Sequence, residues 1–552
     1  MDIVHTSPYP RKDLSNFNPP PELSLALPLP EFSIMKPKTI ASILSFALAL
    51  TSLGAQTEPV KTEYGLVQGT IEDHLAVYRG VPFAAPPVGD LRWKAPQPAD
   101  SWDGVRQTTS FGPDPMQGDG QGNVSEDCLF LNIWSPAKSP DEQLPVLVWI
   151  YGGGFAFGST STPVHNGEHL ARKGVILVSV NYRVGSLGFL AHPELSAESP
   201  DDVSGNYGLL DQIAGLEWIQ NNISAFGGDP DKVTIFGESA GGISVSMLCA
   251  SPKAKGLFRA AISQSGGSFG PSRPTTYPGE NMRTLAMAEQ SGITYAENAG
   301  ASSIEALRKL PAQKLPGGWG SGTSWPIVDG FVIPGDQHEM YQNGNYNDVD
   351  ILVGYNSDEG LSFSRERTVE EWTANVDKRY GPFAEELIAA YPPVGDRVSK
   401  TARDLMRDAA FGWQTWAWAT QQAKTGDSKI FFYYFDQHAD QPADSEAADH
   451  GMPHGVDVPY VFQTLAPNDA NLSEADYTLS DTVSTYWTNF AKHGDPNGPT
   501  VPEWPEYTLD NREVMHFDDK AFVGPVPSAD SLEVLDDYFE WRRTASGKAW
   551  AK

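Results

Sequence analysis

The sequence predicts an α/β protein built around a doubly wound, mostly parallel sheet. Apolar runs of four to eight residues, rich in β-branched and aromatic side chains, are typical of strands buried on both faces. Helical patterns separate these runs, such as the amphipathic stretch 209–220, and alternation of this kind favours a doubly wound sheet. The predicted core strands are 146–151, 175–182, 233–236, 260–263, 351–355 and 430–435.

The remaining elements are placed around this sheet in chain order. The stretches 66–70 and 75–79 predict an opening hairpin. The long segments 270–345 and 361–427 fall between core strands, so we expect lids or a cap over the sheet's C-terminal edge. A final helix is predicted around 532–541. No linker divides the chain, so residues 57–552 are predicted to form a single domain.

The N-terminal region predicts export. Residues 1–34 are rich in proline and are interpreted as a disordered or mis-assigned leader, with Met35 as the true start. A basic beginning at 35–38, an apolar run at 40–53 and small residues at 52–55 predict a signal peptide over 35–55. The run is too short and too rich in serine for a membrane span, so we expect a periplasmic or secreted protein without a stable membrane anchor.

Composition narrows the classes of partner. The chain has 70 Asp and Glu against 39 Lys and Arg, a formal net charge of −31, and no concentration of basic residues, so nucleic acid is not an expected partner. This acidity also argues mildly against an anionic substrate. Cys128 and Cys249 make neither a disulfide scaffold nor a zinc cluster. We expect two buried thiols, and a bridge between them stays open as the alternative.

The stretch Gly-Glu-Ser-Ala-Gly at 237–241 predicts a catalytic serine. It follows the apolar run 233–236 and precedes an apolar helix, which is the context of a nucleophile elbow. Such a turn is so tight that only small residues fit beside it, and it places Ser239 at a helix N-terminus, where partial positive charge favours an oxyanion. The alternative, a glycine-rich turn with an incidental serine, does not account for this context.

A serine nucleophile needs a base and an acid, which follow it in the chain order of such folds. After the strand at 351–354 come Asp358 and Glu359, and after the strand at 430–435 comes a loop with His450 and His454. Three glycines at 152–154 follow the strand 146–151, so their backbone N–H groups can approach a ligand closely and form an oxyanion hole.

Two long motifs resemble those of type-B carboxylesterases. Phe-Gly-Gly-Asp-Pro at 226–230, followed by 233–241, looks like their serine signature, and 126–136 resembles their second signature. The likeness runs from about Tyr64 to Tyr507. The chain is thereby identified as a secreted, bacterial-type member of that family, with an α/β-hydrolase fold, helical lid insertions, and neither metal nor organic cofactor.

The resemblance implies specific roles. It makes Ser239 the nucleophile, Glu359 the acid and His454 the base. It makes the N–H groups of Gly153, Gly154 and Ala240 the oxyanion donors, and it places Glu238 in the gorge, where it adds negative potential. It also implies two structural ion pairs, Arg92 with Glu126 and Arg183 with Asp211.

The chain departs from many relatives near the second signature. Residues 111–117 hold no cysteine to pair with Cys128, and residues 116–127 contain no aromatic side chain to stack on choline. We expect about half of a set of aromatic residues to line the gorge: Phe155, Phe157, Trp319, Trp325, Phe411, Trp413 and Trp416. Among these, Phe155, Trp325 and Phe411 are the predicted substrate contacts.

These observations predict a carboxylic ester hydrolase that acts through an acyl-enzyme on small neutral esters with short-to-medium acyl or aryl groups. One alternative is a lipase acting on long acyl chains, because lid length does not reveal acyl preference. A second is a non-catalytic, esterase-like adhesion protein, which the retained serine, acid, histidine and glycine run disfavour. Nothing in the sequence indicates the oligomeric state.

Overall fold

The computed structural model describes residues 55–551, except 119, 316–321, 394–397, 440, 442–444, 446, 468 and 470. The predicted leader at 1–34 and nearly all of the predicted signal segment at 35–55 lie outside the described residues. The chain from Leu53 to Lys552 forms one unit, which is the part described below.

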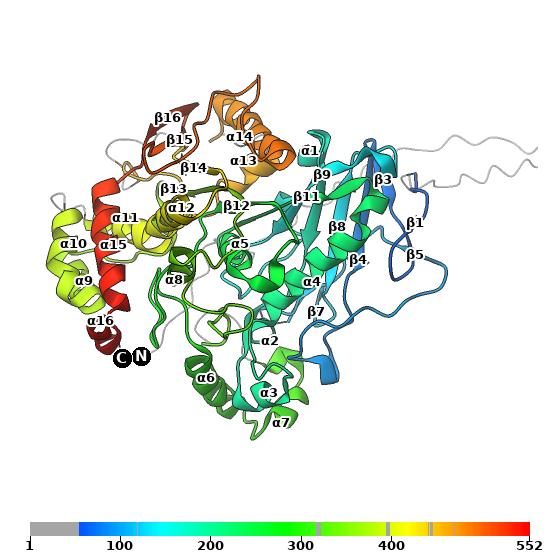
Figure 1. Cartoon of the computed structure of the whole chain (residues 1–552), viewed down its shortest axis with the longest axis horizontal. Coiled ribbons are helices and arrows are strands. Elements are labelled where there is room, and N and C mark those ends of the chain that lie inside the picture. Colours follow the sequence, from blue (N-terminus) through cyan, green and yellow to red (C-terminus); the bar gives the residue numbers. More distant parts are fainter. Residues whose placement is uncertain are drawn as a thin grey trace, which may run out of the picture. The chain divides into compact units, whose positions relative to one another are not determined.

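An eleven-stranded sheet organises this unit, in the order β16-β15-β14-β13-β12-β11-β9-β10-β8-β4-β3 (Figure 1). The seven strands β9 to β15 run parallel to one another, and β3, β4, β8 and β16 pair antiparallel. The mostly parallel sheet predicted from the apolar runs is confirmed. Its strands are β3 (Thr70–Glu72), β4 (Leu75–Pro82), β8 (Phe130–Ser135), β9 (Leu144–Ile150), β10 (Ile176–Val180), β11 (Gly228–Glu238), β12 (Ala260–Gln264), β13 (Asp350–Asn356), β14 (Ile430–Phe435), β15 (Glu513–Phe517) and β16 (Ala521–Pro525).

The predicted opening hairpin is only partly correct. Its second half is β4, which pairs with β3, but the stretch before β3 turns into a separate three-stranded sheet made of β1 (Val60–Lys61), β2 (Leu66–Gln68) and β5 (Val105–Gln107). Val67 of β2 is fully buried there, opposite Val60. A two-stranded pair, β6 (Asp114–Pro115) with β7 (Val124–Ser125), forms the third sheet of the described residues.

Helices cover both faces of the sheet. On one side α5 (Ala240–Ala250) contacts β9, β11 and β12 and also touches α4 (Tyr207–Asn222). On the other side α14 (Glu474–His493) contacts β9 and β11 and packs on α13 (Val458–Phe462). Figure 1 shows these two pairs on opposite sides of the strands. The middle strands are therefore shielded on both faces, and most of their apolar side chains have no exposed surface.

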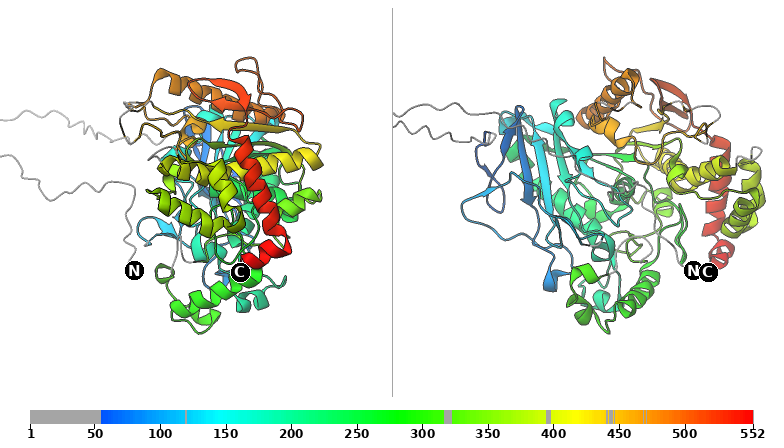
Figure 2. Two further views of the ribbon diagram at one scale, coloured as in Figure 1. Left: turned by 90° about the vertical axis from the view of Figure 1, so that its left-hand side faces the viewer. Right: turned by 180° about the vertical axis from the view of Figure 1, so that it is seen from behind.

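The two long insertions are helical. The first contains α6 (Leu285–Asn298), α7 (Ile304–Arg308) and α8 (Gln337–Gln342), and the second contains α9 (Val369–Tyr380), α10 (Ala384–Ala390), α11 (Val398–Arg407) and α12 (Trp413–Thr425). A π-helical turn at Asp408–Gly412 joins α11 to α12. The C-terminal α15 (Ala529–Arg543), coloured red in Figure 2, contacts α10, α12 and α16 (Ala545–Trp550).

The remaining helical segments are short. They are α1 (Glu168–Arg172), α2 (Gly185–Phe189), α3 (Pro193–Glu198) and the 3-10 turns Gly89–Leu91, Pro140–Glu142, Pro163–His165, Ile223–Phe226, Pro252–Ala254, Ala312–Lys314, Glu359–Ser362 and Gly381–Phe383. Among the described residues, no helix has both the length and the apolarity that crossing a membrane requires.

The parallel strands bring distant parts of the chain to one edge. Ser239 follows β11, Ser265 follows β12, and Glu359 lies just beyond β13, while the loop with His454 comes after β14. Because the carboxyl ends of parallel strands meet at the same edge of a sheet, these residues converge there.

Candidate active site

The predicted elbow is present at the junction of β11 and α5. Ser239 has φ 56° and ψ −123°, a conformation that non-glycine residues rarely adopt. A Cβ atom added to Gly241 would lie 2.0 Å from the carbonyl oxygen of Ile150, and one added to Gly237 would lie 2.5 Å from the backbone of Gly241. Larger residues therefore cannot form this turn without displacing β9.

Three side chains from separate strand ends form a chain of hydrogen bonds. The Oγ atom of Ser239 lies 2.7 Å from Nε2 of His454. The Nδ1 atom of the same imidazole lies 2.5 Å from Oε2 of Glu359. The structure thus brings together the three residues that the sequence assigned as nucleophile, base and acid.

The other two candidates of these loops, Asp358 and His450, do not belong to this chain of hydrogen bonds. Asp358 forms a buried ion pair with Arg403, with 3.0 Å between Oδ1 and Nε, and its other oxygen accepts the N–H of Gly451. The ring that reaches Ser239 belongs to His454 and not to His450. Of the two acids that the sequence offered, the structure places Glu359 in this contact.

Glu359 is fixed from its other side by groups that sequence reasoning missed. Its Oε1 atom accepts the N–H of Asn356 at 2.8 Å and a short hydrogen bond from the hydroxyl of Ser265. The side chain of Glu359 has no exposed surface, so these donors replace the water that a buried carboxylate has lost. Ser265 directly follows β12, and this position at a strand's carboxyl end is the signal that could have identified it.

The glycine run after β9 lies against the serine. A Cβ atom added to Gly152 would meet the Cβ of Ser239 at 3.0 Å. Gly153 has φ 104°, in the region that favours glycine, and the N–H groups of Ala156 and Phe157 donate to its carbonyl oxygen. The loop therefore turns sharply beside Ser239 and brings Gly153 and Gly154 to the same site as Ala240, the first residue of α5.

Glu238 takes the position expected for it only in part, because it lies at the catalytic imidazole but not on the cavity wall. It is absent from the described residues that line the cavity at Ser239, and its Oε1 atom lies 3.3 Å from Nε2 of His454. Burial raises the pKa of Glu238, the positive charge of His454 opposes that rise, and the negative charges of Asp457 and Glu359 add to it. Burial alone would lower the pKa of His454, but Glu359 and Glu238 outweigh it, so the pKa of this imidazole is above its usual value.

Ser239 opens into a cavity of about 540 Å³, a size ordinary for small-molecule sites. Its aromatic lining comes from Phe189, Tyr277, Trp325, Phe363 and Phe411. The rings of Phe411 and Phe363 lie 4.7 and 5.1 Å from the imidazole of His454. Phe411 belongs to the π-helical turn between α11 and α12, an irregularity often found at functional sites.

Phe155 is a second correction. The prediction that it contacts substrate fails because its ring is fully buried, with φ 58° turning it behind the cavity wall. There it packs edge-on against Phe189 and Trp325, at 5.2 and 5.0 Å between centroids. Phe155 therefore supports two residues that do line the cavity.

Of the other aromatic candidates, some line the cavity and some do not. Trp325 and Phe411 line the cavity, whereas Phe157 is exposed and Trp413 and Trp416 are buried without lining it. Trp413 stacks on Phe539 at 4.0 Å between ring centroids. Trp319 lies outside the described residues.

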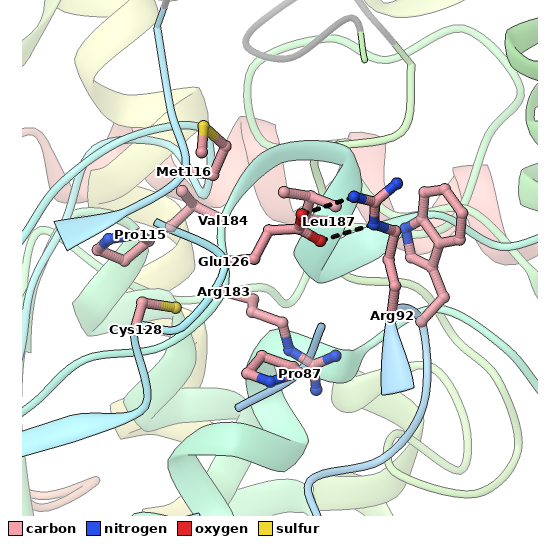
Figure 3. A pocket seen from close by; sticks show the side chains of 10 residues that line it. Pro87, Arg92, Pro115, Met116, Glu126, Cys128, Arg183, Val184 and Leu187 are labelled. Atoms are coloured by element: carbon pink, nitrogen blue, oxygen red, sulfur yellow. Dashed lines mark hydrogen bonds and ion pairs between the residues drawn. The ribbon is translucent and has the colours of Figure 1, made fainter. Parts of the chain in front are cut away.

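The two expected ion pairs are present and belong to the scaffold. Arg92 binds Glu126 through two hydrogen bonds of 2.6 and 2.5 Å, drawn in Figure 3, and Arg183 pairs with Asp211 at 2.7 Å. Arg92, Glu126 and Arg183 border a cavity of only about 10 Å³ beside Cys128, too small for a substrate. Cys128 and Cys249 are both free and buried, and in the described part of the chain no group of three or more His, Cys, Asp or Glu is arranged to hold a metal ion.

Known proteins resemble this chain over most of its length. The model of the carboxylesterase family matches residues 56–533. A fumonisin B1 esterase of Sphingopyxis macrogoltabida is 36% identical over 512 residues, which cover 87% of this chain and 91% of the relative. The para-nitrobenzyl esterase of Bacillus subtilis (strain 168) is 34% identical, with coverage of 86% and 98%.

Solved structures agree with the sequence relatives. The carboxylesterase EST55 of Geobacillus stearothermophilus superposes with a TM-score of 0.75 at 34% identity, covering 86% of this chain and 99% of that one. The predicted α/β-hydrolase fold is thereby confirmed. This chain belongs to the carboxylesterase family and is a carboxylic ester hydrolase.

Proposed function

We propose that the protein hydrolyses small esters with short-to-medium acyl or aryl groups through an acyl-enzyme on Ser239. The observation that carries this proposal is the unbroken chain of hydrogen bonds from Ser239 through His454 to Glu359, at the wall of a cavity large enough for such a substrate. No second protein or nucleic acid is needed for this chemistry.

In the proposed reaction His454 acts first as base and then as acid. Its Nε2 atom takes the proton of Ser239 while Oγ attacks the ester carbonyl, and it later returns that proton to the leaving alcohol. Water then repeats the cycle on the acyl-enzyme and releases the acid. Glu359 holds the imidazole in the productive tautomer, because its carboxylate accepts the Nδ1–H.

The oxyanion of each tetrahedral intermediate would be bound by backbone N–H groups of Gly153, Gly154 and Ala240. The support for this role is the closeness of the 152–154 turn to Ser239 and the place of Ala240 at the start of α5, where the helix dipole favours negative charge.

The proposed substrate class rests on the cavity and on the relatives. Phe189, Trp325 and Phe411 offer apolar surface, whose burial contributes roughly 25 cal/mol per Å². One relative is named a para-nitrobenzyl esterase, which is consistent with an aryl-containing ester.

The experiment is a series of p-nitrophenyl esters from acetate to palmitate at constant detergent. We expect the highest kcat/KM among the short and medium chains, and Ser239→Ala supplies the background rate. A clear optimum at palmitate would instead make the protein a lipase for long acyl chains.

Export is proposed on the sequence pattern alone. The basic start at 35–38, the apolar run at 40–53 and the small residues before Gln56 support cleavage by a signal peptidase. N-terminal sequencing of exported protein should then begin near Ala55 or Gln56, whereas a mature protein that begins at Met1 would contradict this.

A further inference from the structure

The cavity at Ser239 contains an arginine that the ester chemistry does not use. Among the described residues that line it, Arg283 alone carries a formal charge. Arg283 lies two residues before α6 in the first insertion. Burial lowers the pKa of its guanidinium, and no neighbouring carboxylate offsets that effect.

The hydrogen bonds of Arg283 leave its charge uncompensated. Its Nη1 atom donates to the carbonyl oxygen of Gly322 at 2.6 Å and to the hydroxyl of Ser291 at 3.4 Å, and its buried Nε has no partner within the described chain. No Asp or Glu among the described residues forms an ion pair with it. The adjoining stretch 316–321 contains no acidic residue in its sequence.

A second cation lies behind the same wall. The guanidinium of Arg379 is 5.7 Å from the ring centroid of Tyr277, and it also donates to the carbonyl oxygen of Pro278. Tyr277 and Pro278 both line the cavity. The neighbouring Arg273 differs, because its charge is neutralised by Glu280 at 2.9 Å.

The local positive charge at Arg283 is opposite in sign to the net charge of the whole chain. The protein carries a formal net charge of −31, which repels anions at long range, but that field is screened within about 8 Å at physiological salt. A partly buried cation without a counter-ion is unfavourable, and an anionic group on a ligand relieves it. Among the described residues of the lining, none has an acidic side chain that would compete for the guanidinium.

We propose that Arg283 is a specificity-determining residue that binds an ionised carboxylate on the substrate, so that the preferred esters carry a second, free carboxyl group. This inference rests on the proposed ester hydrolysis at Ser239. It narrows the substrate class to half-esters and carboxylated aryl esters, in place of the neutral esters that the sequence predicts. A guanidinium suits this task because its planar fork matches carboxylate geometry.

The test compares matched esters that differ by one carboxylate. On the acyl side, monoethyl glutarate is compared with ethyl pentanoate, and on the alcohol side, 4-acetoxybenzoate is compared with 4-tolyl acetate, all by pH-stat. The measured quantity is the ratio of kcat/KM for the carboxylated ester to kcat/KM for its neutral partner, and the pair that shows the effect tells which side faces Arg283.

In at least one pair we expect Arg283→Gln to lower this ratio roughly ten- to hundredfold, the range of one charge-assisted hydrogen bond. Arg283→Lys keeps the charge and should retain part of the ratio. Arg512→Gln removes an exposed arginine outside the cavity lining and should leave the ratio unchanged.

Salt gives a readout that does not depend on the variants. The wild-type ratio should fall between about 10 mM and about 1 M NaCl, because the Debye length shrinks from about 30 Å to about 3 Å. A purely structural role of Arg283, through its bond to Gly322, would lower both rates together and leave both the ratio and its salt dependence unmoved.

The experiment distinguishes failure of the carboxylate site from failure of the proposed ester hydrolysis. If the wild type cleaves the neutral esters but both ratios are indifferent to salt and to Arg283→Gln, the carboxylate site is refuted and the ester hydrolase stands. If the wild type cleaves none of the four esters, the proposed function itself fails, and the inference with it.

Discussion

The Oγ atom of Ser239 lies 2.7 Å from Nε2 of His454, although 215 positions of the chain separate the two residues. The contact exists because β11 and β14 run parallel in one sheet and present their carboxyl ends at the same edge. It is geometrically sufficient for the serine proton to pass to the imidazole in one step.

Replacing Ser239 by alanine should abolish ester hydrolysis and leave the fold intact, because the hydroxyl supplies the attacking atom and little packing. In reference serine hydrolases, loss of such a residue costs about 10⁴ to 10⁶ in rate. A sulfonyl fluoride or organophosphate should add its mass to the peptide that contains Ser239. Ser246→Ala, on the same helix α5, is the matched control and should remain active and labelled. Labelling elsewhere, with activity kept in Ser239→Ala, would overturn the assignment.

The two histidines of the loop after β14 should behave differently. We expect His454→Ala to be as damaging as Ser239→Ala, because its ring alone joins the serine to Glu359. His450→Ala should keep most of the activity. The measurement is kcat/KM for p-nitrophenyl butyrate, with circular dichroism to show that both variants fold. Equal losses in the two variants would argue against His454 as the base.

Substitutions of the neighbouring acids Glu359 and Asp358 should have different effects, the first on activity and the second on stability. Glu359→Gln should lose most of the activity, because a neutral amide no longer stabilises the imidazolium that forms at His454. Asp358→Asn should instead weaken the buried pair with Arg403, lowering the free energy of unfolding by about 1–3 kcal/mol with activity largely kept. Urea unfolding and initial rates on the same samples measure both. A larger activity loss in Asp358→Asn would mean that the acid is assigned one residue too late.

The pH dependence follows from the carboxylates around His454. A protonated imidazole cannot accept the serine proton, so kcat/KM should fall as the pH is lowered through the apparent pKa. Since Glu359 and Glu238 outweigh burial and raise the pKa of His454, that midpoint should lie above the unperturbed value of about 6.5. It belongs to the coupled group of His454 and its carboxylates rather than to one residue.

Glu238→Gln tests this explanation. The variant removes a group whose ionised form stabilises the imidazolium, since Oε1 of Glu238 lies 3.3 Å from Nε2 of His454, so the midpoint should move to lower pH. A profile that stays flat down to about pH 5 would mean that no histidine acts as base.

The core and the linear order of the site could be predicted because both depend on local pattern. A strand buried on both faces must be apolar throughout, so the runs at 351–355 and 430–435 correspond closely to β13 and β14. The tight geometry of the elbow likewise demands glycine at 237 and 241, which makes Ser239 visible in the sequence.

Side-chain direction beside these motifs could not be predicted. Phe155 adjoins Gly154, and Glu238 adjoins Ser239, yet one turns behind the cavity wall and the other turns toward His454. Backbone torsion and packing from distant segments decide such directions, as the positive φ of Phe155 illustrates. Arg283 was missed because it stands in a loop just before α6, where no sequence motif marks it and only the folded cavity shows that it is the charged residue of the described lining.

Choline esters should be poor substrates. Residues 116–127 contain no aromatic side chain, and none of them is among the described residues that line the cavity at Ser239, so this loop offers no cation–π platform. Arg283 adds a positive charge to the lining, which repels a quaternary ammonium group in a setting of reduced screening. We therefore expect kcat/KM for p-nitrophenyl acetate or butyrate to exceed that for acetylcholine at least tenfold.

The comparison is made by pH-stat, with 3,3-dimethylbutyl acetate as the neutral control of the same shape as acetylcholine. That control should be cleaved faster than acetylcholine if charge repulsion is the cause, and Arg283→Gln should narrow the difference. Turnover of acetylcholine equal to that of the aryl ester would show that the cavity binds cations after all.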